Sequence, residues 1–214
     1  MLPGTKPPRR RDAIGTRRLL LQAAFREVYK SGFQGTDIDT IIRAAGVTKG
    51  ALYHHFASKE ALGYAIVDEV VTEITLEKWV RPLQNPGDPI AAIIAIIDST
   101  SLAPDDLRGG CPLNNLAQEM SPLDEGFRKR IDKVFGDWLG AIAGALRDGQ
   151  KHGLVRDDID PNDIAGFVIA TYEGYISLTK SSQDPRMLES GKRNMARYLG
   201  SLRAPQKRKL RSSV

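Results

Sequence analysis

Apolar residues recur at helical spacing along almost the whole chain, and no stretch alternates with period two for long enough to predict a strand. In residues 14–30, an apolar face is followed by Gly32, which provides a stop. The same spacing predicts further helices near residues 36–45, 48–55, 58–80, 88–102, 112–120, 122–151, 161–181 and 185–202. The pattern predicts an all-α protein of about nine helices.

The ends of two short helices can be assigned from their capping residues. Thr36, with Asp39 three residues on, has the spacing of a capping box, and Gly46 ends that helix. Thr48 can cap the next helix, in which two apolar residues, Leu52 and Phe56, point toward the core. Two short helices joined by a tight turn with a glycine are typical of a helix-turn-helix, whose second helix enters the major groove of DNA.

A long helix is expected directly after this motif. Ser58 can cap it, and Pro82 breaks the chain beyond its end near Val80. Its apolar residues follow one another at intervals of four, with a tryptophan near the end: Leu62, Ile66, Val70, Ile74 and Trp79.

The second short helix, within "GVTKGALYHHFASKEAL", has many hydrogen-bonding side chains. With the two apolar residues turned inward, the outward side carries Thr48, Lys49, Tyr53, His54 and His55. Gly50 would let the backbone approach a phosphate, and the helix N-terminus offers free N–H groups to an anion. Adjacent histidines on a helix diverge by about 100 degrees, so a shared metal ion is disfavoured. DNA contact is favoured over the alternative of uninvolved surface histidines.

Charge is distributed unevenly along the chain. Residues 1–60 carry a net +6, residues 61–202 a net −6, and residues 203–214 a net +5. Such asymmetry suggests a polyanion-binding end attached to another module. The basic arm "KPPRRRD" could be a solubilising tail or could reach into a minor groove, and the tail "PQKRKLRSSV" is expected to be disordered.

Several function classes are disfavoured by what the sequence lacks. One cysteine, Cys111, allows neither an intramolecular disulfide nor a cysteine-built zinc site. No apolar run is long enough to cross a bilayer and no apolar signal region follows the basic N-terminus, so we expect a cytoplasmic protein. No phosphate loop, nucleophile elbow or metal-spaced His and Glu set is present, and we predict no enzyme activity, cofactor or metal. A helical protein-interaction adaptor is the remaining alternative, but it would not need the basic first sixty residues.

The stretch "GTDIDTIIRAAGVTKGALYHHFASKEAL", together with the preceding helix, resembles the DNA-binding segment of the TetR family of bacterial transcriptional regulators, over about residues 16–64. The resemblance implies a homodimer that binds a palindromic double-stranded DNA operator, and repression relieved by an unidentified small-molecule inducer. It implies a helix-turn-helix domain at residues 12–57 and a ligand-binding and dimerisation domain at 58–202, with basic tails at 1–11 and 203–214.

The resemblance also implies roles for individual residues. Thr36 matches a cap residue that touches a backbone phosphate, and Lys59 a position near the backbone after the turn. Tyr53 and His55 match phosphate-contacting positions, and His54 one that touches a base or phosphate. Thr48 and Lys49 match the start of the recognition helix, where base edges and phosphates are reached. Two departures are Ala51, where a hydroxyl residue is frequent, and Ile42, where a small residue is usual.

The second half of the chain contains candidates for the inducer pocket. The helix near 112–120 has polar residues at positions where burial is expected, and these could either anchor a ligand in the pocket or face solvent. Several aromatic residues could either line the pocket or belong to the hydrophobic core. The candidate ligand-binding residues are Trp79, Cys111, Asn115, Glu119, Phe127, Trp138, Tyr172 and Tyr175. Cys111 could alternatively sense electrophiles or oxidants on the same scaffold, or be a small buried hydrophobe.

A stripe of small residues marks the candidate dimer interface. Gly166, Ala170 and Gly174 recur at intervals of four in the helix at 161–181. Such a flat stripe lets another helix approach closely, and the resemblance implies that the last two helices pair with those of a second subunit.

Overall fold

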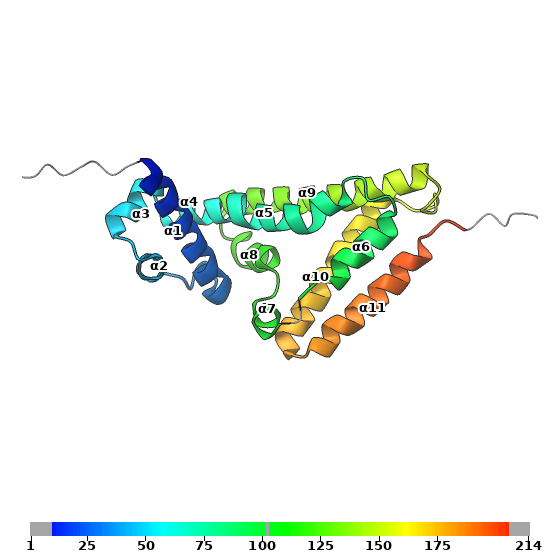
Figure 1. Cartoon of the computed structure of the whole chain (residues 1–214). Helices are drawn as coiled ribbons and strands as arrows, with labels where there is room; N and C mark the ends of the chain where they lie inside the picture. Colours follow the sequence, from blue (N-terminus) through cyan, green and yellow to red (C-terminus); the bar gives the residue numbers. More distant parts are fainter. Residues whose placement is uncertain (1–9, 102, 206–214) are drawn as a thin grey trace, which may run out of the picture. The chain divides into compact units, whose positions relative to one another are not determined.

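The computed structural model describes residues 10–101 and 103–205, with side chains from residue 14 onward. Figure 1 shows that the described chain is helical almost throughout, as the periodicity predicts. Within these ranges the only extended pairing is an isolated bridge between Val155 and Arg203, so the all-α prediction is confirmed. The described helices divide into two compact units, one of residues 1–74 and 112–133 and one of residues 75–111 and 134–214.

The first unit contains the predicted helix-turn-helix. It is built from α1 (Arg10–Ser31), α2 (Ile38–Ala45), α3 (Lys49–His55), α4 (Lys59–Ala65), η1 (Ile66–Val71), most of α5 (Thr72–Thr75), α8 (Pro112–Met120) and the start of α9 (Glu125–Lys151). α1 packs against α2, α3 and α4 through a buried face that includes Leu20, Leu21 and Ala24. This packing holds the two short helices on one scaffold.

Capping residues fix the short helices where the sequence places them, with one exception. Gly32 and Gly46 follow α1 and α2 with φ of 78° and 67°, a conformation that glycine adopts without strain. Ser58 caps α4 by accepting a hydrogen bond from Ala61 N at 3.1 Å. The capping box at Thr36 is wrong, because Asp37 is the N-cap of α2 and accepts from Thr40 N at 2.6 Å.

The long helix expected at residues 58–80 is a succession of α- and π-helical segments. After α4 come η1, α5 and η2 (Leu76–Val80), and η1 and η2 are π-helical. Wider π turns shift which residues face inward. The buried face therefore continues through Val67, Val71, Thr75 and Trp79, whereas Ile74 of the predicted series is 41% exposed.

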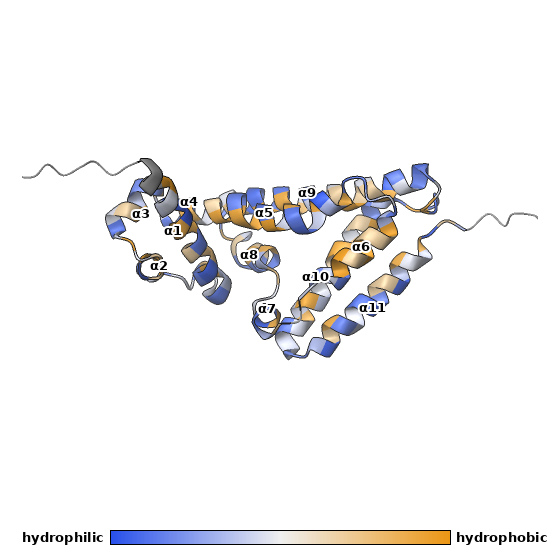
Figure 2. Cartoon of the chain, in the orientation of Figure 1, coloured by the Kyte–Doolittle hydropathy of each residue, from blue (hydrophilic) through white to orange (hydrophobic). Residues whose placement is uncertain are grey.

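The second unit consists of η2, η3 (Arg81–Leu83), α6 (Pro89–Asp98), α7 (Pro104–Gly109), the rest of α9, α10 (Pro161–Ser182) and α11 (Pro185–Ser201). α10 and α11 lie side by side, and α6 packs on α11 (Figure 1). α6 is coloured as hydrophobic along most of its length in Figure 2, and Ile90, Ile93 and Ile97 are buried there. The short helix α7 was not predicted from the sequence.

None of the helices at residues 10–101 and 103–205 is long and apolar enough to cross a membrane.

Candidate functional site

α3 separates its apolar and polar side chains onto opposite faces. Thr48 caps the helix by accepting a hydrogen bond from Ala51 N at 3.2 Å. Leu52 is 0% exposed and Phe56, the C-cap, is 4% exposed, so both anchor the helix to the unit. The outward face carries the exposed residues Thr48, Lys49, Gly50, Tyr53 and His54. The prediction of an outward polar face on this helix is confirmed.

The charged groups on this face are available to an incoming anion. Lys49 Nζ lies 3.7 Å from Asp39 Oδ1, and the two side chains are 64% and 67% exposed. Exposed pairs of this kind contribute little to stability, so a phosphate can replace the carboxylate at small cost. The arrangement offers a cationic, hydroxyl-bearing helix face whose lysine has only an exposed carboxylate as its partner.

His55 lies at the edge of the α3 face and is half-buried. Its ring centroid is 5.1 Å from that of His54. The pKa of His55 is lowered from its ordinary value, first by burial and then by the charges of His54 and Arg17. Neutral His55 is therefore favoured in the free protein at neutral pH.

Two residues assigned by the resemblance lie beside the motif but not on the exposed face of α3. Thr36 is 3% exposed, and its hydroxyl donates to Gly32 O at 2.7 Å. Lys59 is half-buried, with Nζ 3.5 Å from Gln34 O and 4.7 Å from the centre of the Phe33 ring. Phosphate contacts by these two side chains stay predictions.

Glu119, a candidate pocket residue on α8, contacts the turn between α1 and α2. Its carboxylate oxygens accept hydrogen bonds from Phe33 N at 2.8 Å and Gln34 N at 2.7 Å. A Cβ at Gly32 would come within 3.0 Å of both oxygens, so the glycine leaves room for the carboxylate. α8 is thereby tied directly to the helix-turn-helix. This contact joins residues 86 positions apart, and no local sequence pattern could have indicated it.

Phe127, another pocket candidate, is a core residue of the first unit. It is 0% exposed, and its ring centroid lies 4.7 Å from Phe33 and 5.1 Å from Tyr64. A Cβ at Gly63 would lie 2.4 Å from Phe127 Cζ, so only glycine fits at this approach. The Tyr64 hydroxyl donates to the carboxylate of Asp124 at 2.9 Å, which fixes the ring against Phe127.

The amides of α8 are half-buried or exposed, not deeply buried. Asn115 is half-buried, and the exposed Gln118 reaches Asn114 Oδ1 at 3.5 Å. The buried face of the helix is apolar and consists of Leu113, Leu116 and Met120. A pocket role for Asn115 stays a prediction.

Three of the predicted aromatic residues meet in the second unit. Trp79, Trp138 and Tyr172 are 2%, 2% and 4% exposed. The Trp79 ring centroid lies 4.7 Å from that of Trp138 and 5.2 Å from that of Tyr172. Trp138 Nε1 is buried and has no hydrogen-bond acceptor among the described residues. We call these three side chains the aromatic cluster.

Lys78, which the sequence reading missed, reaches the aromatic cluster. Its Nζ donates to the Tyr172 hydroxyl at 2.7 Å and to Thr100 Oγ1 at 3.2 Å. Burial lowers the pKa of Lys78, and the charges of Cys111 and Glu173 oppose that change. Burial raises the pKa of Tyr172, so its hydroxyl stays protonated. The only signal for Lys78 in the sequence was its position next to Trp79. The predicted inward face of this helix was wrong at Ile74, so the periodicity did not indicate that Lys78 reaches the cluster.

A second lysine is buried nearby. Lys192 is 8% exposed, and its Nζ donates to Asp98 O at 3.0 Å and Thr100 O at 2.9 Å. It also lies 3.7 Å from Glu189 Oε1. Lys192 therefore ties α11 to the end of α6 and shares Thr100 with Lys78.

Two further candidates lie at other places in the second unit. Cys111 is half-buried and directly precedes α8. The Tyr175 ring packs directly on Gly191, so closely that a Cβ at this glycine would lie 2.4 Å from the ring. The Tyr175 hydroxyl accepts a hydrogen bond from Asn194 Nδ2 at 3.3 Å. Tyr175 thus packs α10 against α11.

The predicted small-residue stripe is open. Ala170 and Gly174 are exposed, and Gly166 is half-buried. A Cβ at either glycine would meet no atom within 4 Å. Phe167 and Leu178 of the same helix are 49% and 53% exposed. α10 therefore presents small residues flanked by large apolar ones.

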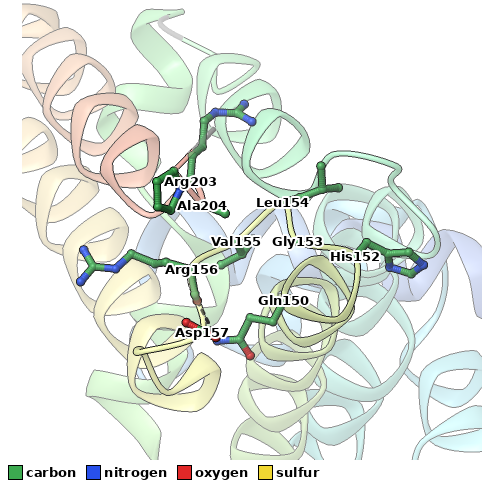
Figure 3. Close-up of a pocket in the computed structure, with 10 residues that line it drawn as sticks. Gln150, His152, Gly153, Leu154, Val155, Arg156, Asp157, Arg203 and Ala204 are labelled. Atoms are coloured by element: carbon green, nitrogen blue, oxygen red, sulfur yellow. Dashed lines mark hydrogen bonds between the residues drawn. The ribbon is translucent and has the colours of Figure 1, made fainter. Parts of the chain in front are cut away.

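A surface pocket of about 690 Å³ lies between the α9–α10 connection and the chain after α11 (Figure 3). Three of its polar side chains have protein partners. Arg156 forms an ion pair with Asp158, and Gln150 donates to Arg156 O at 3.0 Å, drawn dashed in Figure 3. Arg203 pairs with Asp88 at 2.7 Å. His152 and Asp157 also line it, and the lining ends at Pro205, next to residues outside the described part.

In the part of the chain that the structure describes, no three His, Cys, Asp or Glu side chains are grouped so that they could hold a metal ion. The N-terminal arm and the end of the basic tail, residues 1–9 and 206–214, lie outside the described residues.

Two family models match the chain. The one described as "Bacterial regulatory proteins, tetR family" matches residues 20–66, which include α2 and α3. The one described as "Tetracyclin repressor-like, C-terminal domain" matches residues 89–195, half of the chain.

Individual relatives agree with these matches. The chain is 29% identical to the HTH-type transcriptional repressor DhaR of Mycobacterium sp. (strain GP1), over 81% of this chain and 86% of that protein. It is 34% identical to the A-factor receptor protein of Streptomyces griseus over 76% of this chain, but spans only 54% of that protein. A TetR transcriptional regulator from Chloroflexus aurantiacus has a similar crystal structure, with TM-score 0.81, 29% identity, and 91% and 100% of the two chains covered.

Proposed function

Because the chain belongs to the TetR family of bacterial transcriptional regulators and is a ligand-responsive DNA-binding regulator, we propose that it is a repressor. In this proposal a dimer binds a palindromic operator through α3, and a small molecule bound in the second unit releases it. The repressor name of DhaR and the receptor name of the A-factor protein support repression and ligand response.

The exposed face of α3 is the observation that carries the DNA-binding part of the proposal. The helix is capped by Thr48, anchored by Leu52 and lined on its outer side by Lys49, Tyr53 and His54. Only seven residues long, it can present its N-terminal side chains to base edges while its buried side holds its angle. The net charge of +6 over residues 1–60 would attract the DNA backbone to this end of the chain.

Dimerisation through α10 and α11 explains the open stripe on α10. A second copy would cover Phe167 and Leu178, which are about half exposed here, and the glycines would allow close helix approach. Two α3 helices could then meet half-sites about one turn of DNA apart. The oligomeric state is measurable by sedimentation, and a monomer at micromolar concentration would contradict this part of the proposal.

Ligand response requires a path from the second unit to α3. α9 and the α4–η2 succession each run through both units, and Cys111 of the second unit directly precedes α8. α8 holds the α1–α2 turn through Glu119. We infer that movement of these helices on ligand binding changes the presentation of α3. A coupling free energy of about 1–3 kcal/mol would change operator affinity roughly 5- to 150-fold.

One observation favours the alternative that Cys111 senses electrophiles or oxidants. Cys111 is half-buried and interacts electrostatically with Lys78, and a nearby ammonium stabilises a thiolate. The alkylation rate of Cys111 by iodoacetamide across pH 6–9 would test this. A thiol that reacts like free cysteine, with no loss of DNA binding after modification, would exclude it.

The proposed function is tested by fluorescence anisotropy with DNA flanking the protein's own gene, across a salt series and with unrelated DNA as the control. Specific binding should weaken steeply with salt, because each phosphate contact releases counterions. A Lys49→Ala variant should bind more weakly and with a shallower salt slope. Equal, weak binding to both DNAs by the wild type and the variant would contradict the proposal.

A further inference from the structure

Lys78 is a half-buried cation whose two hydrogen-bond partners are uncharged hydroxyl groups. The charges of the buried Glu173 and of Cys111 act on the ammonium, but burial outweighs them and lowers the pKa of Lys78. Its hydrogen bonds go to two hydroxyl groups, those of Tyr172 and Thr100, which are themselves 3.0 Å apart. An ammonium has three donors, so one remains after these two bonds. Burial therefore still disfavours the charged ammonium, and an anion that accepts from its remaining donor would recover part of that free energy.

The aromatic cluster contains a second unused donor. Trp138 is 2% exposed, and its Nε1 has no acceptor among the described residues, which is an unfavourable state for a buried indole N–H. Its ring centroid lies 5.9 Å from that of Tyr172, the residue that holds Lys78. The Lys78 Nζ lies 5.2 Å from the Tyr172 ring centre and 6.0 Å from that of Trp79. The Lys78 ammonium therefore lies next to aromatic rings.

The charged groups around Lys78 include a second lysine, Lys192, and the buried carboxylate of Glu173. Lys78, Thr100 and Cys111 keep partial exposure, whereas the aromatic side chains behind them are buried. The second lysine, Lys192, shares Thr100 through its backbone oxygen at 2.9 Å. A small solute that enters from the partly exposed side would meet the ammonium first, with the aromatic side chains behind it.

We propose that the effector of this regulator is a small organic carboxylate with an apolar body, whose carboxylate binds Lys78 and the Tyr172 hydroxyl while the body packs on the aromatic cluster. This proposal rests on the proposed function for its regulatory meaning, but not for the binding itself. A carboxylate has the lone pairs to accept from both groups, and the charge-assisted bond to an ammonium is the stronger kind. A neutral amide of the same shape would lack the charge.

Both tryptophans of the chain, Trp79 and Trp138, belong to this cluster, so intrinsic fluorescence reports on it directly. Benzoate, phenylacetate and butyrate would be titrated into the full-length protein at constant ionic strength, each beside its neutral amide. At least one carboxylate should change the fluorescence saturably, with its amide bound at least about tenfold more weakly, the expected loss of one charge-assisted contact. No saturable change with any carboxylate up to 10 mM, or equal binding of the amides, would overturn the proposal.

Matched variants assign the binding to the named side chains. Lys78→Met keeps the length of the side chain without its charge, and Lys78→Gln serves if the first variant does not fold. Either, and also Tyr172→Phe, should weaken carboxylate binding about tenfold or more. Lys151→Met, at an exposed lysine of the same unit paired with Asp148, should bind as the wild type does. Unchanged affinity in both the Lys78 and Tyr172 variants would overturn the proposal.

Operator binding is measured separately by anisotropy without any carboxylate. If operator binding fails while the carboxylate binds, the proposed repressor function is wrong and the ligand site stands. If the operator binds and no carboxylate does, the ligand site is wrong and the repressor proposal stands. When both succeed, adding the carboxylate should lower operator affinity in the wild type but not in Lys78→Met.

Discussion

The chain uses a lysine and a tyrosine twice, in opposite surroundings. On α3, the Lys49 side chain is 64% exposed and Tyr53 is 45% exposed, and both face away from the core. In the second unit, Lys78 is half-buried and donates to Tyr172, which is 4% exposed. Lys49 and Tyr53 are exposed, so a large polyanion such as DNA can contact both side chains from the solvent side. The inner pair suits a small ligand that is surrounded by protein.

The two sites contain the same residue types, and they differ because the residues that pack around each lysine and tyrosine differ. Lys49 and Tyr53 stand outward because Leu52 holds the other side of a short helix in the core. Lys78 and Tyr172 meet because two tryptophans pack beside them. The exposed site should therefore tolerate loss of its own side chains without unfolding, and the inner site should not tolerate loss of its tryptophans.

The largest effect is expected from Trp138→Ala, which removes a fully buried ring from the aromatic cluster. Losing such a side chain from a packed core costs about 3–5 kcal/mol of unfolding free energy. Chemical denaturation followed by circular dichroism would measure the loss. Leu139→Ala, at a 37% exposed neighbour on α9, is the control and should cost much less. Equal costs for the two variants would mean that the cluster is not a packed core.

The double variant Lys49→Ala and Tyr53→Ala should act on DNA binding alone. Operator affinity is expected to fall about 30- to 100-fold, with a shallower salt slope, because phosphate contacts are lost. Unfolding free energy should change by less than about 0.5 kcal/mol per site, because neither side chain is buried. Lys151→Ala, which is exposed in the second unit, should leave both quantities unchanged. Operator affinity that survives the double change would show that α3 does not carry the recognition.

Glu119→Gln would sharpen the comparison, since this carboxylate supports the exposed site from behind. Glutamine has one acceptor oxygen in place of the two carboxylate oxygens, so one of the bonds to Phe33 N and Gln34 N is lost, together with the charge. We expect a loss of about 1–2 kcal/mol in unfolding free energy and a smaller loss of operator affinity than in the double variant. Thermal denaturation and anisotropy measure the two effects. Gln118→Ala on the exposed side of α8 is the control, and identical behaviour of the two variants would argue against the contact.

The sequence predicted the exposed site better than the inner one, for a physical reason. Capping residues and helical spacing are local, and they placed the polar face of α3 and its Thr48 cap correctly. Even there Thr36 was misassigned as the cap, because its hydroxyl bonds back to Gly32 O, which leaves Asp37 to cap α2. Such competition between neighbouring side chains is decided by geometry that composition does not show.

The inner site depends on contacts between residues far apart in the chain. Tyr172 and Lys78 are 94 positions apart, and π turns shifted the face on which Lys78 lies. Periodicity assumes 3.6 residues per turn, so it misassigned the inward series at Ile74. The predicted pocket set was also divided, because Phe127 and Glu119 support the first unit while Trp79, Trp138 and Tyr172 cluster in the second. Aromatic composition indicated the cluster but not its cation.

The smallest expected effect is the pH dependence of DNA binding through His55. The pKa of His55 in the free protein lies below its ordinary value, mainly through burial, so the folded protein favours the neutral ring. Because the unfolded chain binds a proton more readily at this residue, the contribution of His55 to folding stability decreases as the pH falls. A DNA phosphate beside the ring would raise the pKa, so the complex binds more protons than the free protein. Operator affinity should then rise as pH falls from 8 to 6, by at most about tenfold per pH unit for one proton.

The pH dependence of His55→Asn should be flatter, since the amide keeps a polar side chain that does not titrate. His152→Asn, at an exposed histidine of the second unit, should keep the wild-type slope. Anisotropy at pH 6, 7 and 8 and fixed ionic strength measures both. A wild-type slope that persists in His55→Asn would place the proton uptake on another group. An identical flat profile in all three proteins would mean that His55 does not face a phosphate, and the recognition surface would then end at His54.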